Sequence, residues 1–190
     1  VSRCGIINVS DTDLGWTPLG IGWTSKMSNA KRGKLMLDIF IKYIGVESPE
    51  EPGQLFDFLI RNTNRVMKSS LAGAVAGTIS LLDGLFKSHQ IPESNTDAAI
   101  VLEKLFLYAL TWSLGGLLED EDRSKFDTYV RGLDPNGMMP EVEQGETIYE
   151  YFVNTSTNDW SKWQAPQWEY PQTEHLDFSN ILVPTMDSVR

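Results

Sequence analysis

Residues 98–118 read AAIVLEKLFLYALTWSLGGLL, and this run decides the fold. Apolar side chains occur at nearly every position, so a helix formed here has no polar face and other helices must surround it. The run is about as long as a membrane span, but Glu103 and Lys104 interrupt it and no basic flank follows. We therefore expect the central helix of a protein core.

Further helices are expected on both sides of this run. Apolar residues recur at helical spacing from Leu35 to Ile44, and Gly45 is placed to end that helix. The same spacing predicts helices from Gln54 to Met67, over residues 71–86 and over residues 122–131. The expected fold class is therefore mainly α.

The pattern changes beyond Gly132. Residues 149–153 are rich in aromatic side chains and predict a strand, residues 154–158 predict a polar turn, and residues 160–163 predict a returning strand. Together they indicate an exposed β-hairpin, followed by an extended, proline-containing connector.

At the other end of the chain, the apolar run from Gly5 to Val9 predicts a buried strand. A chain that opens straight into such a strand, without an initiator methionine, reads as a piece cut from something longer.

Composition excludes several classes of protein. With 41% hydrophobic and 22% charged residues the chain is expected to fold, and a formal charge of -10 argues against binding to nucleic acid or to anionic lipid. The basic stretch at residues 26–34 lacks aromatic residues for base stacking and is predicted to be a solvated, mobile loop.

Metal and disulfide sites are not indicated. The chain has one cysteine, Cys4, and neither of its two histidines has a partner at metal-ligand spacing. The acidic residues 119–122 do not have the spacing of a calcium loop, and we interpret them as the first turn of a helix, where the helix dipole favours negative charge.

The motif search gives one false lead and one candidate. Residues 20–27 resemble a phosphate-binding loop, but Ser25 and Met27 flank Lys26 where that loop needs glycine and then serine or threonine. Without such a loop or a general base, we expect no catalysis by this chain alone.

The candidate is Ser2-Arg3-Cys4, just ahead of a strand, which resembles the arginine-finger motif of AAA+ ATPases. From the residues alone, Arg3 is either such a finger or a strand-edge arginine in a salt bridge.

Longer segments resemble dynein heavy chains and occur in the same order. They are residues 1–7, 14–19, 105–116, 148–153, 160–163 and 181–190. The resemblance covers essentially the whole chain and is to the junction of the second and third AAA+ modules of the motor ring, in the axonemal branch. It implies that residues 1–10 are the last strand of a large subdomain and residues 11–143 its helical lid. Residues 144–172 would be the hairpin and connector, and residues 173–190 the start of the next module.

The resemblance also implies roles for individual residues. Arg3 matches the finger that acts in trans on ATP held by the first module, and Val183, Pro184 and Thr185 match a loop that packs near the adenine of the third module. Arg61 and Arg65 are the basic candidates for a sensor arginine of the lid, with a solvated helix face as the alternative. ATP or ADP with magnesium would be bound by the parent protein.

Partners and location follow from the same resemblance. The neighbouring AAA+ modules, microtubules and the dynein intermediate and light chains are the expected partners, with no nucleic acid and no membrane. The expected location is the cytoplasm and cytoskeleton, in the axoneme of a cilium or flagellum. Two alternatives remain: a free-standing helical interaction module that binds through Trp160 and Trp163, and the lid of a different AAA+ machine.

Overall fold

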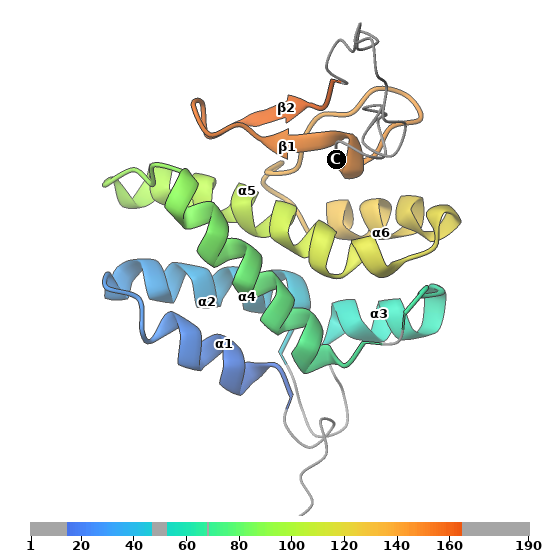
Figure 1. The fold of residues 1–190 in the computed structure, drawn as a ribbon, viewed down its shortest axis with the longest axis horizontal. Helices are drawn as coiled ribbons and strands as arrows, with labels where there is room; N and C mark the ends of the chain where they lie inside the picture. The colour runs from blue at the N-terminus through green and yellow to red at the C-terminus, as the bar shows by residue number, and fades with distance from the viewer. Residues whose placement is uncertain (1–14, 47–52, 68, 165–190) are drawn as a thin grey trace, which may run out of the picture.

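The computed structural model describes residues 15–46, 53–67 and 69–164 (Figure 1). Within these ranges the chain is mainly helical, as predicted. The elements are α1 (Thr17–Thr24), α2 (Ala30–Ile44), α3 (Gln54–Asn62), α4 (Leu71–Ser88), α5 (Asn95–Ser113), the 3-10 helix η1 (Gly115–Leu117), α6 (Asp120–Gly132), the 3-10 helix η2 (Ile148–Glu150), β1 (Tyr151–Val153) and β2 (Trp160–Lys162). The predicted strand at residues 1–10 and the predicted segments beyond residue 164 lie outside the described ranges.

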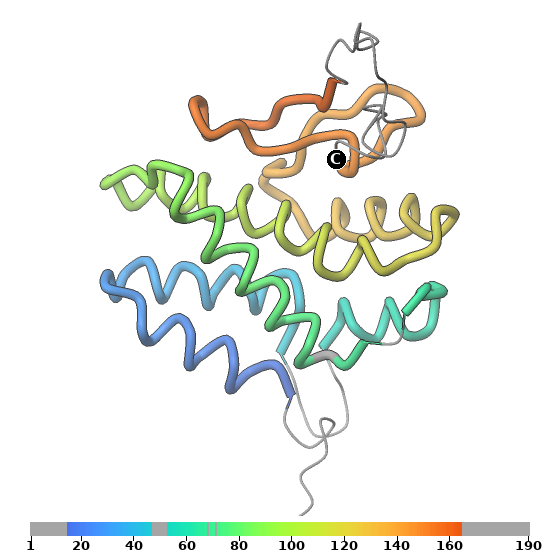
Figure 2. Tube along the Cα trace, viewed as in Figure 1, coloured from blue at the N-terminus to red at the C-terminus, as the bar shows by residue number. Residues whose placement is uncertain are grey.

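The apolar run forms α5 at the centre of the molecule. Leu105, Phe106, Leu107 and Leu110 are each 0% exposed. Helices α2 and α4 both pack against α5, and α4 runs obliquely across the bundle (Figure 2). By length and composition, Asn95–Leu117 could cross a membrane, but 61% of its most apolar window is buried inside the fold. The prediction of a core helix is confirmed.

Aromatic rings connect the outer helices to α5. The ring of Phe40 on α2 lies 4.8 Å from that of Phe106, edge to face, and the ring of Trp16 stacks on Phe40 at 5.8 Å. Trp16 is 1% exposed and immediately precedes α1. Helix α1 was not predicted, because it contains glycines and has no apolar stripe. Long-range contacts such as that of Trp16 with Phe40 hold it in place.

Helix α2 begins earlier than predicted and corrects the interpretation of the basic stretch. Asn29 caps the helix, since its side-chain oxygen accepts hydrogen bonds from the backbone N–H groups of Lys31 at 3.0 Å and Arg32 at 3.3 Å. The guanidinium of Arg32 also donates to the carbonyl oxygen of Pro92 at 2.9 Å. The second half of the stretch at 26–34 is therefore helix and not loop.

Two glycines make the close approach of α2 to α3 possible. Gly45 ends α2 at φ 96° and Gly53 precedes α3 at φ 98°, both in the left-handed region. A Cβ atom on Gly45 would lie 2.7 Å from the backbone nitrogen of Gln54, and one on Gly53 would lie 2.7 Å from the carbonyl oxygen of Ile44. Any other residue at either position would force the two helix ends apart.

The predicted helix from Gln54 to Met67 is too long. Helix α3 ends at Asn62, where the side chains of Asn62 and Thr63 donate to the carbonyl oxygens of Phe58 and Leu59 at 3.1 and 2.7 Å. The chain then pairs with the segment after α5, because the backbone N–H of Val66 donates to the carbonyl oxygen of Leu117 at 2.9 Å. Tertiary hydrogen bonding has overridden a local helical pattern.

The hairpin is confirmed, but it is not exposed on both faces. Strands β1 and β2 are antiparallel, with Phe152 opposite Ser161. Tyr151 is 9% and Val153 4% exposed, because β1 covers α5 on the side away from α2 (Figure 1). The indole N–H of Trp160 donates to the carbonyl oxygen of Met138 at 2.7 Å. One face of the hairpin therefore belongs to the core.

Candidate functional site

The residues predicted to serve nucleotide chemistry fall at the two ends of the chain. Arg3, and Val183, Pro184 and Thr185, lie outside the described residues, so their roles stay predictions. The false phosphate loop at residues 20–27 is described: it is the second half of α1 and the turn after it, in which the Ser25 hydroxyl donates to the carbonyl oxygen of Gly22 at 3.1 Å. It does not form the glycine-rich loop that cradles a phosphate.

Each of the two arginines considered as the sensor of the lid contacts a nearby group of this chain. Arg61 is on α3, where its Nε lies 2.6 Å from the carboxylate of Asp57 one turn earlier, and its side chain is 74% exposed. Arg65 follows α3, forms an isolated bridge with Leu118 and donates from its guanidinium to the carbonyl oxygen of Ser69 at 3.1 Å. Arg61 thus matches the solvated-face alternative, whereas Arg65 holds a loop in place.

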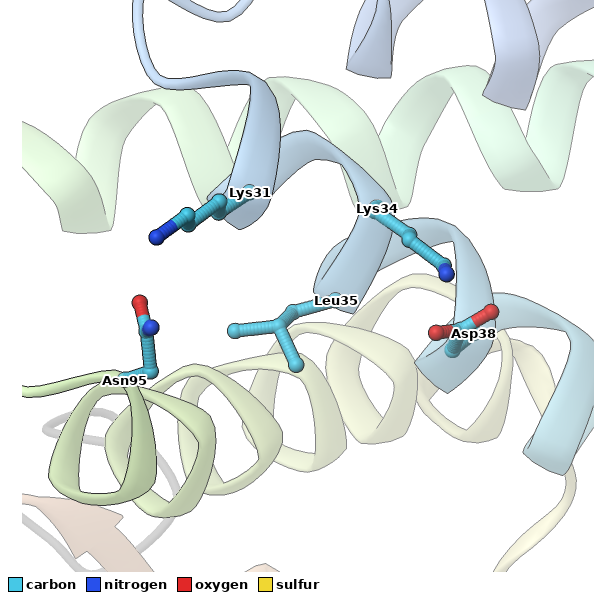
Figure 3. Close-up of a pocket in the computed structure, with 5 residues that line it drawn as sticks. All are labelled: Lys31, Lys34, Leu35, Asp38 and Asn95. Atoms are coloured by element: carbon cyan, nitrogen blue, oxygen red, sulfur yellow. The ribbon is translucent and has the colours of Figure 1, made fainter.

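An open cleft lies between the first turns of α2 and the start of α5. It encloses about 300 Å³ and is lined by Lys31, Lys34, Leu35, Asp38 and Asn95. Lys31 and Asn95 extend toward each other across it, and Leu35 lies between the two helices (Figure 3). The charged residues of the lining are two lysines and one aspartate, and the lining holds no aromatic ring on which a base could stack.

A charged cluster that sequence reasoning missed joins α2, α5 and the segment after α6. The ammonium of Lys42 contacts the carboxylate of Glu103 and lies 3.5 Å from that of Asp134, whose side chain is 2% exposed. The hydroxyl of Tyr43 donates to Glu103 at 2.7 Å. Burial, reinforced by Glu103, raises the pKa of Tyr43 above its usual range, so the hydroxyl keeps its proton.

Two further buried carboxylates come from α6. Asp122 accepts from the backbone N–H of Asn64 at 2.6 Å and pairs with Lys125 at 2.5 Å, and these partners lower the pKa of its carboxyl. Asp127 accepts from the backbone N–H of Ile148 at 2.7 Å and from the guanidinium of Arg131. The acidic start of α6 was explained by the helix dipole alone, and the structure adds that Asp122 ties the helix to the loop after α3.

A keyed contact fixes the entry to the hairpin. Tyr149 is 1% exposed, and a Cβ atom on Gly115 would lie 2.1 Å from its hydroxyl oxygen. The guanidinium of Arg123 lies over the same ring, 5.3 Å from its centre. Burial raises the pKa of Tyr149. The ring can therefore occupy this position only because residue 115 has no side chain.

One sequence signal could have found part of this arrangement. Glu103 and Lys104 are the charges that interrupt the apolar run, and both form ion pairs with residues distant in sequence. Glu103 pairs with Lys42 on α2, and Lys104 pairs with Asp159 beside β2 at 2.6 Å. Because an isolated charge in an apolar helix needs a partner, each marked a contact between elements.

No group of three or more histidine, cysteine, aspartate or glutamate side chains that could hold a metal ion occurs among the described residues.

Ion pairs and hydrogen bonds therefore join the helices to one another and to the hairpin. A helical bundle of this order, with a short hairpin after its last helix, is consistent with the class of helical AAA+ lid subdomains. The family model described as the dynein heavy chain AAA lid domain matches residues 52–165, and the chain belongs to that family.

Individual relatives are similar along the whole chain. The chain is 37% identical over 196 residues to the dynein gamma chain of the flagellar outer arm of Chlamydomonas reinhardtii. It is 30% identical over 194 residues to dynein axonemal heavy chain 8 of Homo sapiens. Each alignment covers 100% of this chain but only 4% of the relative's length.

Proposed function

We propose that this chain serves as the lid of one AAA+ module in an ATP-driven, minus-end-directed microtubule motor of the axoneme. In this proposal the lid closes over nucleotide, supplies an arginine finger to a neighbouring site and couples adjacent modules, without catalysis of its own. Membership of the dynein heavy chain lid family carries the proposal. The axonemal and flagellar names of the relatives support the location in a cilium or flagellum.

The packing supports a mechanical role. Residues from α2, α3, α4, α5 and α6 share one apolar core with η2 and β1, and Trp23 of α1 packs against it. Cores of this kind are close-packed, so a displacement applied at one helix moves the others together. A lid with this construction transmits a change at the nucleotide as a rigid-body rotation.

Arg3 is the proposed chemical contribution to the neighbouring site. An arginine supplied in trans stabilises the charge that spreads over the transferred phosphoryl group, and such fingers are worth about 10³- to 10⁵-fold in turnover. In the full heavy chain, Arg3→Ala should slow ATP hydrolysis by about that factor while nucleotide binding is spared. Single-turnover hydrolysis and mant-nucleotide titration measure the two quantities.

Two companion variants make this experiment specific. Arg3→Lys keeps the charge but loses the planar fork, so hydrolysis should recover only in part. Arg61→Ala removes an exposed arginine whose carboxylate partner in the structure is Asp57, one turn away on the same helix, and should leave turnover unchanged. Unchanged turnover in Arg3→Ala would sink the finger assignment.

The adenine role proposed for Val183, Pro184 and Thr185 is tested separately. If the backbone and apolar groups of this loop pack against adenine, Val183→Asp should weaken ATP and ADP binding, with magnesium present, at the third module alone. Fluorescent nucleotide binding to single-site variants of the heavy chain measures this effect. Equal affinities would assign the segment to strand packing instead.

The interaction-module alternative has less support. It relied on the aromatic hairpin around Trp160 and Trp163 as the partner-binding surface, whereas the Trp160 indole is partly buried and donates to the carbonyl oxygen of Met138. Replacement of Trp160 would therefore disturb the hairpin before it disturbed any partner.

A further inference from the structure

The hairpin has too little structure of its own to be stable alone. Strands β1 and β2 have 3 residues each and, among the described residues, pair only with each other. Isolated hairpins of this size are marginal in water. The order of the hairpin must therefore come from the helices on which it lies.

Three contacts hold the turn end of the hairpin. The carboxylate of Asp159 pairs with the ammonium of Lys104 on α5 at 2.6 Å. The side-chain amide of Asn158 donates to the carbonyl oxygen of Gln90 at 2.8 Å, and the ring Nε2 of His89 lies 3.2 Å from the carbonyl oxygen of Val153. The turn is thus fixed to the end of α4 and to α5 at once.

The opposite end of the hairpin is fixed to α6 and its following segment. The backbone N–H of Ile148, in η2 just ahead of β1, donates to Asp127 on α6 at 2.7 Å, and the hydroxyl of Tyr151 donates to Glu146 in the segment after α6 at 2.9 Å. Attachment at both ends, with Tyr151 and Val153 buried between them, leaves no hinge between the hairpin and the helical bundle.

We propose that the hairpin is a strap locked across α5, which moves with the helical bundle and passes its displacement to the chain beyond residue 164. The Lys104–Asp159 pair is the positioning contact of this strap, because it ties the turn directly to α5. The mechanical consequence rests on the proposed function, whereas the locked strap stands on the contacts alone.

Hydrogen exchange in the full heavy chain tests the strap. Asp159→Asn removes the charge but keeps an oxygen that can accept the backbone N–H of Trp160, which now donates to Asp159 at 2.7 Å. Amide exchange should rise by about two- to fivefold over residues 151–162, with α2 and α3 unchanged. The control is Asp57→Asn, which breaks an ion pair of equal length, 2.6 Å, on α3 and should leave exchange of the hairpin unchanged. The exchanged pair Lys104→Asp with Asp159→Lys should restore protection.

The outcomes separate the strap from the motor function. Equal exchange of the hairpin in Asp159→Asn and in the unaltered chain, or unprotected hairpin amides in the unaltered chain, would overturn the strap. If the strap is correct, an ATP-dependent change of exchange in the lid should also appear in the hairpin and be lost there in Asp159→Asn. A lid that shows no nucleotide-dependent change at all, with the hairpin protected, would contradict the proposed function and leave the strap intact.

Discussion

The helical side and the hairpin side of the molecule are held by different forces. Between α2 and α5 most contacts are apolar and aromatic, beside the ion pair of Lys42 with Glu103. Phe40, Tyr43 and Phe106 are all 0% exposed. Between α5, α6 and the hairpin, carboxylates and backbone groups make many of the contacts, as Asp127 does with Ile148. The first side gains its stability from burial, which salt does not screen, whereas the second gains position from directed contacts that are individually weak.

The largest effect should come from the aromatic centre. Phe106→Ala removes a ring that contacts both Phe40 and Tyr43, and the lost burial with the cavity left behind should cost about 3–5 kcal/mol. Chemical denaturation monitored by circular dichroism measures the loss. The control Leu19→Ala, at a side chain that is 40% exposed, should change stability by less than about 0.5 kcal/mol. Similar losses for the two variants would contradict the assignment of the core.

The junction of α2 and α3 should be next in sensitivity. Gly45→Ala places a Cβ against backbone in the left-handed region, so we expect a loss of about 1–3 kcal/mol. Gly84→Ala is the matched control, because Gly84 lies inside α4 and a Cβ atom added there would meet nothing within 4 Å. Alanine there should raise stability by up to about 1 kcal/mol. Thermal unfolding of the pair decides whether the opposite signs hold.

The smallest effect concerns pH on the polar side. The pKa of Asp122 is lowered in the folded chain, first by Lys125 and then by the backbone of Asn64. Its contribution is therefore present above the ordinary value of 3.8 and is lost as the pH falls through the lower folded value. Asp122→Asn should flatten the stability profile below about pH 4 and leave its shape near pH 7 unchanged. An acid limb as steep as that of the unaltered chain would show that Asp122 does not contribute.

The same contrast explains how much the sequence could predict. The run at 98–118 predicted α5 because burial leaves a continuous apolar pattern, and the spacing from Leu35 to Ile44 and the aromatics at 149–153 predicted α2 and the hairpin. The end of α3 was missed because Val66 pairs with Leu117, a contact between distant segments that local spacing does not record. Asp134 and Asp127 were not predicted as contact residues, since only the folded chain brings Lys42 and Ile148 to them.

Gly115 has a consequence for how the chain tolerates change. The Tyr149 hydroxyl occupies the space that a side chain at residue 115 would need. The backbone of η1 at Gly115 therefore leaves room for a ring from η2. Gly116, next in the chain, has as its nearest neighbour a Trp112 ring carbon at an ordinary 3.7 Å from the Cβ position. Two adjacent glycines therefore differ sharply: alanine is tolerable at the second, whereas at the first it would expel Tyr149 and shift the point from which the hairpin departs.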